Sequence, residues 1–172
     1  MNKLLMGACL TMAMQVGHSQ TLPQLSKDPI EKIVAAMTAE EKVSLLVGTG
    51  MPGFGGQSAV VGSTQNIVPG AAGTTFPIER LGIPAIVVAD GPAGLRISPT
   101  REGNKATYYC TAFPVATLLA STWNTALVKN VGNAMGDEVK EYGCDVLLAP
   151  ALNIHRSPLC GRNFEYYSED PY

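Results

Sequence analysis

Residues 124–150 read Asn124-Thr-Ala-Leu-Val-Lys-Asn-Val-Gly-Asn-Ala-Met-Gly-Asp-Glu-Val-Lys-Glu-Tyr-Gly143-Cys-Asp-Val-Leu-Leu-Ala-Pro150, and this stretch decides the fold class. Its first part predicts a helix, because Asn124 is a good N-cap, apolar residues recur at helical spacing and Gly143 can end the helix. The apolar run at 144–150 predicts a buried strand, and a similar run at 83–90 lies upstream. The order strand, helix, strand predicts the parallel sheet of an α/β protein.

Shorter elements are expected before and within this unit. Asp28 as N-cap and Pro29 as first helical residue predict one helix, and Thr38-Ala-Glu-Glu41 predicts the capping box of a second. Residues 48–73 are rich in Gly, Pro, Ser and Thr and predict a long loop, which lacks the Gly-Lys-Ser/Thr sequence of a phosphate-binding loop. The apolar segment at 111–122 is expected to form another buried strand.

Composition narrows the class of partner. The 12 Lys and Arg residues and 14 Asp and Glu residues are scattered and give a net charge of −2. Because there is no basic stripe, nucleic acid is not expected as a partner. After the N-terminal apolar segment the chain has Cys110, Cys144 and Cys160. Their spacing fits no zinc site and defines no disulfide pairing, so we expect free, partly buried thiols.

The N-terminal residues 1–19 resemble a secretory signal. Lys3 provides a basic start, residues 4–16 are mostly apolar, and Gly17-His-Ser19 offers small residues for cleavage. The apolar part is too short to span a bilayer, which needs about 20 residues. A buried N-terminal helix is the alternative. We expect a signal peptide at 1–19, followed by a secreted or periplasmic domain at 20–172.

Polar residues follow two of the predicted strands, at the strand ends where functional residues of parallel α/β proteins gather. Asp90-Gly-Pro-Ala-Gly-Leu-Arg96 follows the strand at 83–90, and residues 149–172 follow the strand at 144–150. Asp90 either caps the Gly-Pro turn or accepts hydrogen bonds from ligand hydroxyls. Arg96 is expected to hold Asp90 or another carboxylate.

The densest polar cluster is Gly161-Arg-Asn-Phe-Glu-Tyr-Tyr-Ser-Glu-Asp-Pro171. Arg162 lies there among carboxylates, an amide, a hydroxyl and aromatic rings, a mixture too polar for a core and suited to a hydroxyl-rich ligand. A solvated charge cluster is the alternative. His155 is expected to be a structural hydrogen-bonding residue, because neither a catalytic triad nor a multi-histidine metal site can be assembled around it.

Several motifs occur in a fixed order along the chain. They are Met37-Thr-Ala-Glu-Glu-Lys42, Pro77-Ile-Glu-Arg-Leu-Gly-Ile-Pro84, Asp90-Gly-Pro-Ala-Gly-Leu-Arg96, Phe113-Pro114 and the segment from Leu148 to Pro171. This series strongly resembles glycoside hydrolase family 3, the β-glucosidase and β-xylosidase group. The resemblance runs from about residue 30 to the last residue, and the ordered series is far more specific than any single motif.

The resemblance implies a (β/α)8 TIM-like barrel, which takes about 250 residues. The chain would then carry an incomplete N-terminal half of that barrel. The resemblance further implies a retaining, exo-acting β-glycosidase, first of all a β-glucosidase, that removes terminal β-linked sugars from oligosaccharides or glycosides. Asp90 and Arg162 would bind the sugar in the subsite before the cleaved bond, and Arg96 would support them.

The same resemblance implies that the catalytic groups lie outside this chain. Family members use an Asp nucleophile from a later barrel strand and a Glu acid/base from a following domain. We therefore expect no catalytic residue, no metal and no cofactor within the chain, and no activity from residues 20–172 alone. A β-xylosidase of the same family and a non-catalytic sugar-binding relative are the alternatives.

Overall fold

The computed structural model describes residues 21–49 and 67–172. Its helices and strands, in chain order, are α1 (Ile30–Ala36), α2 (Ala39–Val47), β1 (Gly73–Thr74), η2 (Glu79–Leu81), β2 (Val87–Asp90), α3 (Ala116–Ser121), α4 (Thr125–Glu141), β3 (Val146–Leu148) and η3 (Asn163–Glu165). The labels η2 and η3 denote single turns of 3-10 helix. The expected signal peptide at 1–19 and the glycine-rich part of the long loop at 50–56 lie outside the described residues.

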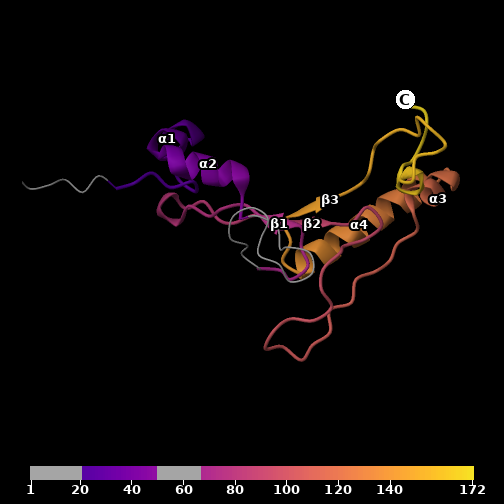
Figure 1. Cartoon of the computed structure of the whole chain (residues 1–172), viewed down its shortest axis with the longest axis horizontal. Helices are drawn as coiled ribbons and strands as arrows, with labels where there is room; N and C mark the ends of the chain where they lie inside the picture. Colours follow the sequence, from indigo (N-terminus) through magenta and orange to yellow (C-terminus); the bar gives the residue numbers. More distant parts are fainter. Residues whose placement is uncertain (1–20, 50–66) are drawn as a thin grey trace, which may run out of the picture.

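A three-stranded sheet lies between the two N-terminal helices and α4 (Figure 1). The strand order is β1-β2-β3, with β1 antiparallel to β2 and β2 parallel to β3. The parallel pair, connected through α3 and α4, confirms the strand–helix–strand unit that the sequence predicts. The two-residue β1 adds an antiparallel strand at the end of the segment expected to be a loop.

Helix α4 begins and ends as its sequence predicts. The Asn124 side chain accepts a hydrogen bond from the Leu127 N–H at 3.0 Å. Gly143 follows the helix with a left-handed φ of 78°, a conformation in which a Cβ is unfavourable. Met135 and Val139 are the buried residues of its apolar face. The helix therefore lies against the sheet along one face.

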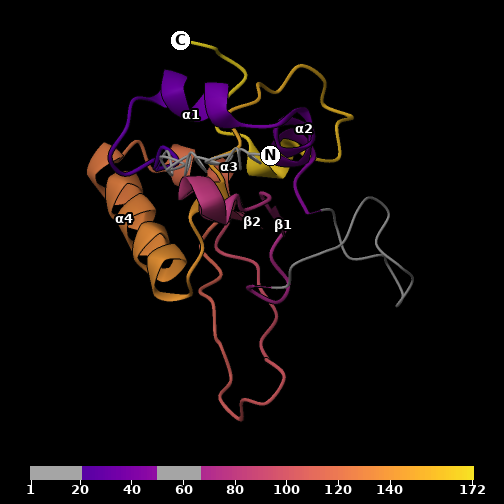
Figure 2. The same cartoon turned by 90° about the vertical axis from the view of Figure 1, so that its left-hand side faces the viewer.

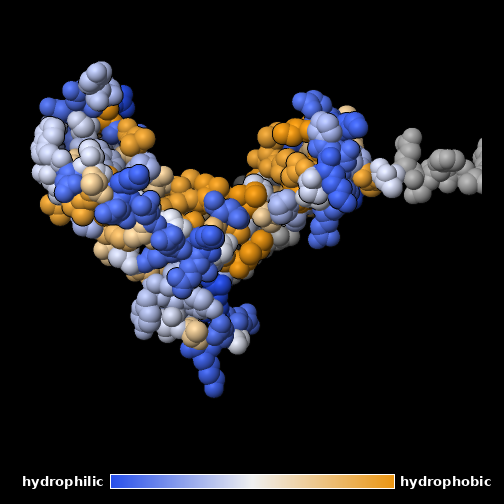
Figure 3. Space-filling model, turned by 180° about the vertical axis from the view of Figure 1, so that it is seen from behind, coloured by the Kyte–Doolittle hydropathy of each residue, from blue (hydrophilic) through white to orange (hydrophobic). Residues whose placement is uncertain are grey.

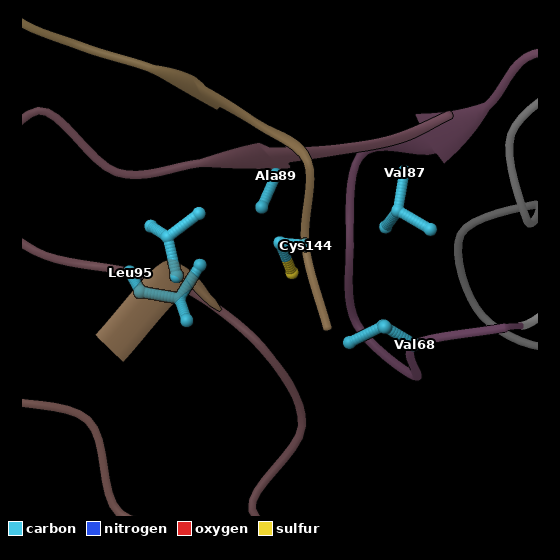
Figure 4. Packing of buried hydrophobic residues seen from close by; sticks show 6 residues of the cluster. Val68, Val87, Ala89, Leu95 and Cys144 are labelled. Carbon is cyan, nitrogen blue, oxygen red and sulfur yellow. The ribbon is translucent and has the colours of Figure 1, made fainter. Parts of the chain in front are cut away.

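The main core lies between the sheet and α4 (Figure 4). Its buried residues come from the segment before β1, from β2, from the turn after β2, from α4 and from the segment that leads into β3: Val68, Val87, Ala89, Leu95, Val139 and Cys144. Full burial of a valine or leucine side chain contributes about 1.5–3 kcal/mol. Leu95 matters for the site, because its burial anchors the turn that follows Asp90.

The N-terminal helices form a second, smaller core with η2. Its buried residues are Ile33, Met37, Ile78 and Leu81. Thr38 and Glu41 form the predicted capping box at the start of α2. Arg80 of η2 donates from Nε and Nη2 to the Glu41 carboxylate at 2.6 and 2.5 Å, and from Nη2 to the Ala36 carbonyl at 2.8 Å. One arginine thus fastens η2 to both helices.

The prediction of a strand at 111–122 is wrong. The segment contains the helix α3, which is preceded by Val115 in an extended conformation. A short apolar run does not by itself distinguish a strand from a helix. The residues of α3, Ala116-Thr-Leu-Leu-Ala-Ser121, are dominated by alanine and leucine, which favour helix over strand. The segment forms a helix because it contains few β-branched residues, which favour strands.

The predicted start of α1 is wrong by one residue. Pro29 occupies the N-cap position, and Ile30 is the first helical residue. The Asp28 carboxylate does not cap this helix. It accepts a hydrogen bond from the backbone N–H of Gln24 at 3.0 Å, so it stabilises the turn before the helix instead.

The apolar runs of β2 and β3 predict strands that are buried on both faces, and this prediction is wrong. Along β2, Val87 and Ala89 are buried and the alternate residues are half-buried. On β3, Val146 and Leu148 are 42% and 51% exposed. Seen from behind, hydrophobic side chains line the floor of the hollow between the two raised ends of the molecule (Figure 3). Within the described residues, one face of the sheet is covered and the other is open.

The segment between β2 and α3 forms a long loop that extends from the body of the molecule (Figure 2). The end of this loop is fastened to α4, because the Thr111 N–H donates to the Glu138 carboxylate at 3.1 Å. Within residues 21–49 and 67–172, no helix combines the length and apolar character needed to cross a membrane.

Candidate functional site

Asp90 stands at the carboxyl end of the parallel strand pair. Its Cα partner in β3 is Leu148, and both residues are the last of their strands. The carboxyl ends of neighbouring parallel strands lie at the same edge of a sheet. The turn after Asp90 and the segment after Leu148 therefore share one rim, as the sequence predicts.

Two glycines let the chain fold back sharply after Asp90. Gly91 and Gly94 have φ values of 153° and 126°, and a Cβ on Gly94 would lie 2.2 Å from the carbonyl oxygen of Thr111. Backbone hydrogen bonds close the turn: the Gly94 N–H donates to the Gly91 carbonyl at 3.2 Å, and the Arg96 N–H donates to the Asp90 carbonyl at 2.9 Å. Backbone hydrogen bonds thus close the turn without a contribution from the Asp90 carboxylate.

The Asp90 carboxylate is therefore not needed as the cap of its turn. Arg96 Nη2 lies 3.7 Å from Asp90 Oδ2, which is the arrangement expected of Arg96. The Asp90 side chain is 41% exposed and that of Arg96 is 77% exposed, and an exposed ion pair of this kind contributes only about 0–1 kcal/mol. Arg96 orients Asp90 without burying it, so the carboxylate stays accessible to a ligand.

Arg162 lies at the start of η3, in the segment that follows β3. Its Nε donates to the carboxylate of Glu165 in a close ion pair. The Arg162 side chain is 68% exposed, whereas Glu165 is buried. Pairing through Nε uses one donor of the guanidinium and leaves those of its terminal amino groups for other partners.

Part of the polar cluster at 161–171 is buried, contrary to the expectation that it is too polar for a core. Glu165 is 8% exposed and Tyr166 is 7% exposed. A buried carboxylate without a partner would be costly, but the single turn of η3 brings Glu165 back to Arg162. The ion pair is the physical reason why the carboxylate is tolerated there.

Neighbouring groups stabilise the charge of Arg162. The pKa of the Arg162 guanidinium is raised above its ordinary value, first by the hydrogen bond and charge of Glu165, then by Tyr166, and also by the negative charge of Asp90. The contribution of Asp90 is the smallest of these, and the common rim follows from the register of β2 and β3. With Arg96 already beside Asp90, the structure gathers all three predicted site residues on one rim.

Two donors hold the η3 turn from different elements. The Thr117 hydroxyl of α3 faces the carbonyl oxygens of Asn163, Phe164 and Tyr166 at 3.1, 3.3 and 3.0 Å. His155 Nε2 lies 2.8 Å from the Asn163 oxygen and 3.1 Å from the Tyr166 oxygen. Because a carbonyl oxygen only accepts, His155 must carry its proton on Nε2. His155 is therefore a structural hydrogen-bonding residue, as expected.

The three cysteines of the described residues are free. Cys144 is buried and Cys110 is half-buried, but Cys160 is exposed rather than partly buried. Burial raises the pKa of the Cys144 and Cys110 thiols above their ordinary value. Among the described residues, no group of three or more His, Cys, Asp and Glu side chains is arranged to hold a metal ion.

Apolar surface adjoins the polar rim. Phe164, two residues after Arg162 and within η3, is 56% exposed. An apolar cavity of about 320 Å³ lies between α4 and the carboxyl end of the sheet, with Pro92, Met135 and Tyr167 in its lining. The rim thus offers charged groups for hydroxyls beside apolar surface for the carbon skeleton of a ligand.

Two residues of this region escape sequence reasoning. Thr117 is 46 residues away from Asn163, and it lies in a segment expected to be a strand, so no local signal reveals the contact. The pairing of Glu165 with Arg162 does have a signal, because residues three apart meet on one turn of helix. A helical reading of residues 162–165 would have found it.

Comparison with known proteins identifies the family. The family model "Glycosyl hydrolase family 3 N terminal domain" matches residues 32–172. Thermostable beta-glucosidase B of Acetivibrio thermocellus is 42% identical over 148 residues, which cover 83% of this chain and 17% of that protein. Beta-glucosidase A of Butyrivibrio fibrisolvens is 43% identical over 146 residues, covering 85% of this chain and 15% of that protein.

A solved structure extends the likeness to three dimensions. Beta-glucosidase 3B from Thermotoga neapolitana, in complex with alpha-D-glucose, matches with a TM-score of 0.74 and 61% sequence identity, over 84% of this chain and 19% of that chain. This chain belongs to glycosyl hydrolase family 3, and the matched region is the N-terminal domain of that family. This chain covers less than a fifth of the length of each of these β-glucosidases.

Proposed function

We propose that this chain is the first part of a retaining, exo-acting β-glucosidase that hydrolyses terminal β-linked glucose from oligosaccharides or glycosides. The observation that carries the proposal is the common rim of the sheet: Asp90 ends β2 beside the end of β3, and the segment that follows β3 carries Arg162. A carboxylate accepts hydrogen bonds from sugar hydroxyls and a guanidinium donates to sugar oxygens, so the two groups together suit neighbouring oxygens of a pyranose. The β-glucosidase relatives support glucose as the sugar.

In this proposal the chain binds the sugar and other parts of a longer protein supply the reacting groups. Retaining hydrolysis needs a nucleophile and an acid/base whose carboxyl groups stand about 5–5.5 Å apart. Glu165 is buried against Arg162, and Asp90 is the group to which this proposal gives sugar binding, so we assign neither of them to those roles. The greater length of the relatives supports placing both groups outside residues 20–172.

We also propose that β2, α4 and β3 begin a (β/α)8 barrel of which this chain holds the N-terminal half. The parallel pairing of β2 with β3 supports this proposal, as does the exposure of Val146 and Leu148 on the open face of the sheet. Further barrel elements would cover these side chains. Residues 20–172 expressed alone should therefore be poorly soluble or loosely folded.

The test is hydrolysis of 4-nitrophenyl β-D-glucopyranoside and β-D-xylopyranoside by the full-length protein and by residues 20–172. We expect the full-length protein to cleave the glucoside with retention of anomeric configuration, and the shorter chain to cleave neither. A preference for the xyloside would make the protein a β-xylosidase. Sugar binding without hydrolysis would favour the non-catalytic relative. Hydrolysis by residues 20–172 that disappears in Asp90→Ala would contradict the assignment of the catalytic groups.

Export is a separate proposal that rests on the sequence alone. Lys3, the apolar residues 4–16 and the small residues near Ser19 support a signal peptide that delivers the enzyme to the periplasm or the medium. N-terminal sequencing of the exported full-length protein should find a start between Gly17 and Leu22. An exported protein that retains Met1 would contradict this proposal.

A further inference from the structure

We infer that Thr117 and His155 are positioning residues that hold the η3 turn and thereby aim Arg162 at the bound sugar. The contacts of these two residues with the turn are seen in the structure. The effect of these contacts on catalysis rests on the proposed function. Neither residue touches the sugar in this account. Both act through the backbone carbonyls of Asn163, the first residue of η3, and of Tyr166, which follows the turn.

The two donors converge on the same pair of acceptors. Thr117 Oγ1 lies 3.1 Å from the Asn163 oxygen and 3.0 Å from the Tyr166 oxygen. His155 Nε2 lies 2.8 Å and 3.1 Å from the same two oxygens. Thr117 comes from α3, whereas His155 comes from the segment between β3 and η3. The turn is therefore clamped between two elements that are far apart in sequence.

The η3 turn needs these external hydrogen bonds because it has few internal ones. η3 is three residues long, and the Arg162 side chain makes no capping hydrogen bond at its start. Its internal hydrogen bonds are those of the Glu165 N–H to the Arg162 carbonyl at 3.1 Å and of the Tyr166 N–H to the Asn163 carbonyl at 3.2 Å. A single turn of 3-10 helix with so few bonds is not stable in isolation.

The position of this turn decides where the guanidinium points. Arg162 is largely exposed, so packing alone does not fix its side chain. Its direction is set by the ion pair to Glu165, which sits in the same turn and is buried. If the turn shifts, the ion pair and the guanidinium shift with it. A misplacement of about 1 Å in a binding group can cost up to about 100-fold in rate.

His155 is itself held in place. Its backbone N–H donates to the Ser168 carbonyl at 3.1 Å, which ties the two ends of the segment around η3 together. Its ring lies 6.0 Å from the ring of Tyr166. The backbone hydrogen bond and the Tyr166 ring thus hold the His155 ring in place, with Nε2 near the turn. Loss of the ring would remove this donor.

Hydrogen exchange tests the clamp without reference to activity. In the full-length protein, Thr117→Val removes the hydroxyl and keeps a similar shape, Thr117→Ser keeps the hydroxyl, and Ser121→Ala is the matched control. The Ser121 hydroxyl also belongs to α3, but it donates to the Thr117 carbonyl of its own helix at 2.8 Å. We expect the amides of Glu165 and Tyr166 to exchange at least about tenfold faster in Thr117→Val, and at the wild-type rate in the other two variants.

Kinetics test whether the clamp acts through Arg162. We expect Thr117→Val to lower kcat/KM for the aryl β-glucoside by about tenfold, and Thr117→Ser to retain most of the wild-type value. In an Arg162→Ala background, Thr117→Val should have no further effect, because the group that it positions is already gone. Two independent losses that multiply would indicate a general structural role instead.

His155 provides the second arm of the same test. The side-chain amide nitrogen of His155→Gln can replace the Nε2 donor, whereas His155→Ala removes it. We expect the glutamine variant to exchange more slowly at Tyr166 and to keep a higher kcat/KM than the alanine variant.

If the Glu165 and Tyr166 amides exchange at the wild-type rate in both Thr117→Val and His155→Ala, the inference that these two residues hold the η3 turn is wrong. This conclusion does not depend on the hydrolytic activity of the variants. Faster exchange with wild-type kcat/KM would overturn its link to Arg162 while the proposed function stands. A full-length wild-type protein that cleaves no glycoside would overturn the proposed function and the catalytic part of the inference, and exchange would still decide whether the turn is clamped.

Discussion

Asp90 and Leu148 are Cα partners in the register of β2 and β3, and each is the last residue of its strand. Because of this register, the turn that begins at Gly91 and the segment that leads to Arg162 leave the sheet at the same edge. Polar residues from two separate parts of the sequence thus reach one rim. The rim is set by strand pairing, and the backbone bonds of the turn keep the Asp90 carboxylate accessible.

Arg162→Lys should be nearly as damaging as Arg162→Ala in the full-length enzyme. Lysine keeps the positive charge, but it has neither the Nε donor that pairs with Glu165 nor the planar fork that can contact two neighbouring oxygens. We expect kcat/KM for an aryl β-glucoside to fall at least about tenfold in both variants. Near-normal turnover by the lysine variant would show that charge alone is needed there.

Glu41→Gln should destabilise the N-terminal domain at neutral pH and have a smaller effect in acid. The hydrogen bonds from Arg80 and from the Thr38 N–H lower the pKa of Glu41 from 4.5 to about 2. A carboxylate whose pKa is lowered by folding stabilises the folded state above its unfolded pKa, and this contribution is lost as the pH falls from about 4.5 towards 2.

Calorimetry of wild type and Glu41→Gln across this pH range measures the effect. The difference in unfolding temperature between the two proteins should be largest near pH 7 and should shrink steadily below pH 4.5. Glu31→Gln, which removes an exposed carboxylate from α1, is the control and should differ little from wild type. A difference that does not depend on pH would contradict the assigned role of the Arg80–Glu41 pair.

Thiol reactivity should rank the cysteines by exposure. Cys160 is exposed, whereas burial raises the pKa of the Cys144 thiol and lowers its thiolate fraction. Brief treatment of the folded full-length protein with iodoacetamide at pH 8, followed by peptide mapping, should label Cys160 well before Cys144. Equal labelling of the two residues would contradict the packing of the segment before β3.

The elements that the sequence predicts well are those with strong local signals. Helix α4 has an N-cap at Asn124, a long apolar periodicity and a C-terminal Gly143, and all three agree with the structure. The capping box of Thr38 and Glu41 is equally local. The residues of helix α3 do not distinguish a helix from a strand, because a run of six apolar and small residues fits either period.

The site likewise contains residues that the sequence predicts and contacts that it does not. Asp90 and Arg162 follow predicted strands, so the rule that functional residues gather at strand ends is enough to place their segments at the same edge of the sheet. Burial of Glu165 depends on the geometry of one 3-10 turn, and the contact of Thr117 with that turn depends on how α3 packs. Such long-range contacts follow from tertiary structure and leave no pattern in a single sequence.

The most direct test of the central claim is kcat/KM of the full-length Asp90→Ala variant for 4-nitrophenyl β-D-glucopyranoside. A hydrogen bond to a charged group contributes about 1.5–3 kcal/mol, so we expect a loss of at least about tenfold with little change in unfolding temperature. Asp137→Ala, which removes an exposed carboxylate from α4, should keep the wild-type value. Unchanged kcat/KM in Asp90→Ala, or a loss that merely follows a loss of folded protein, would contradict the claim that Asp90 binds the sugar.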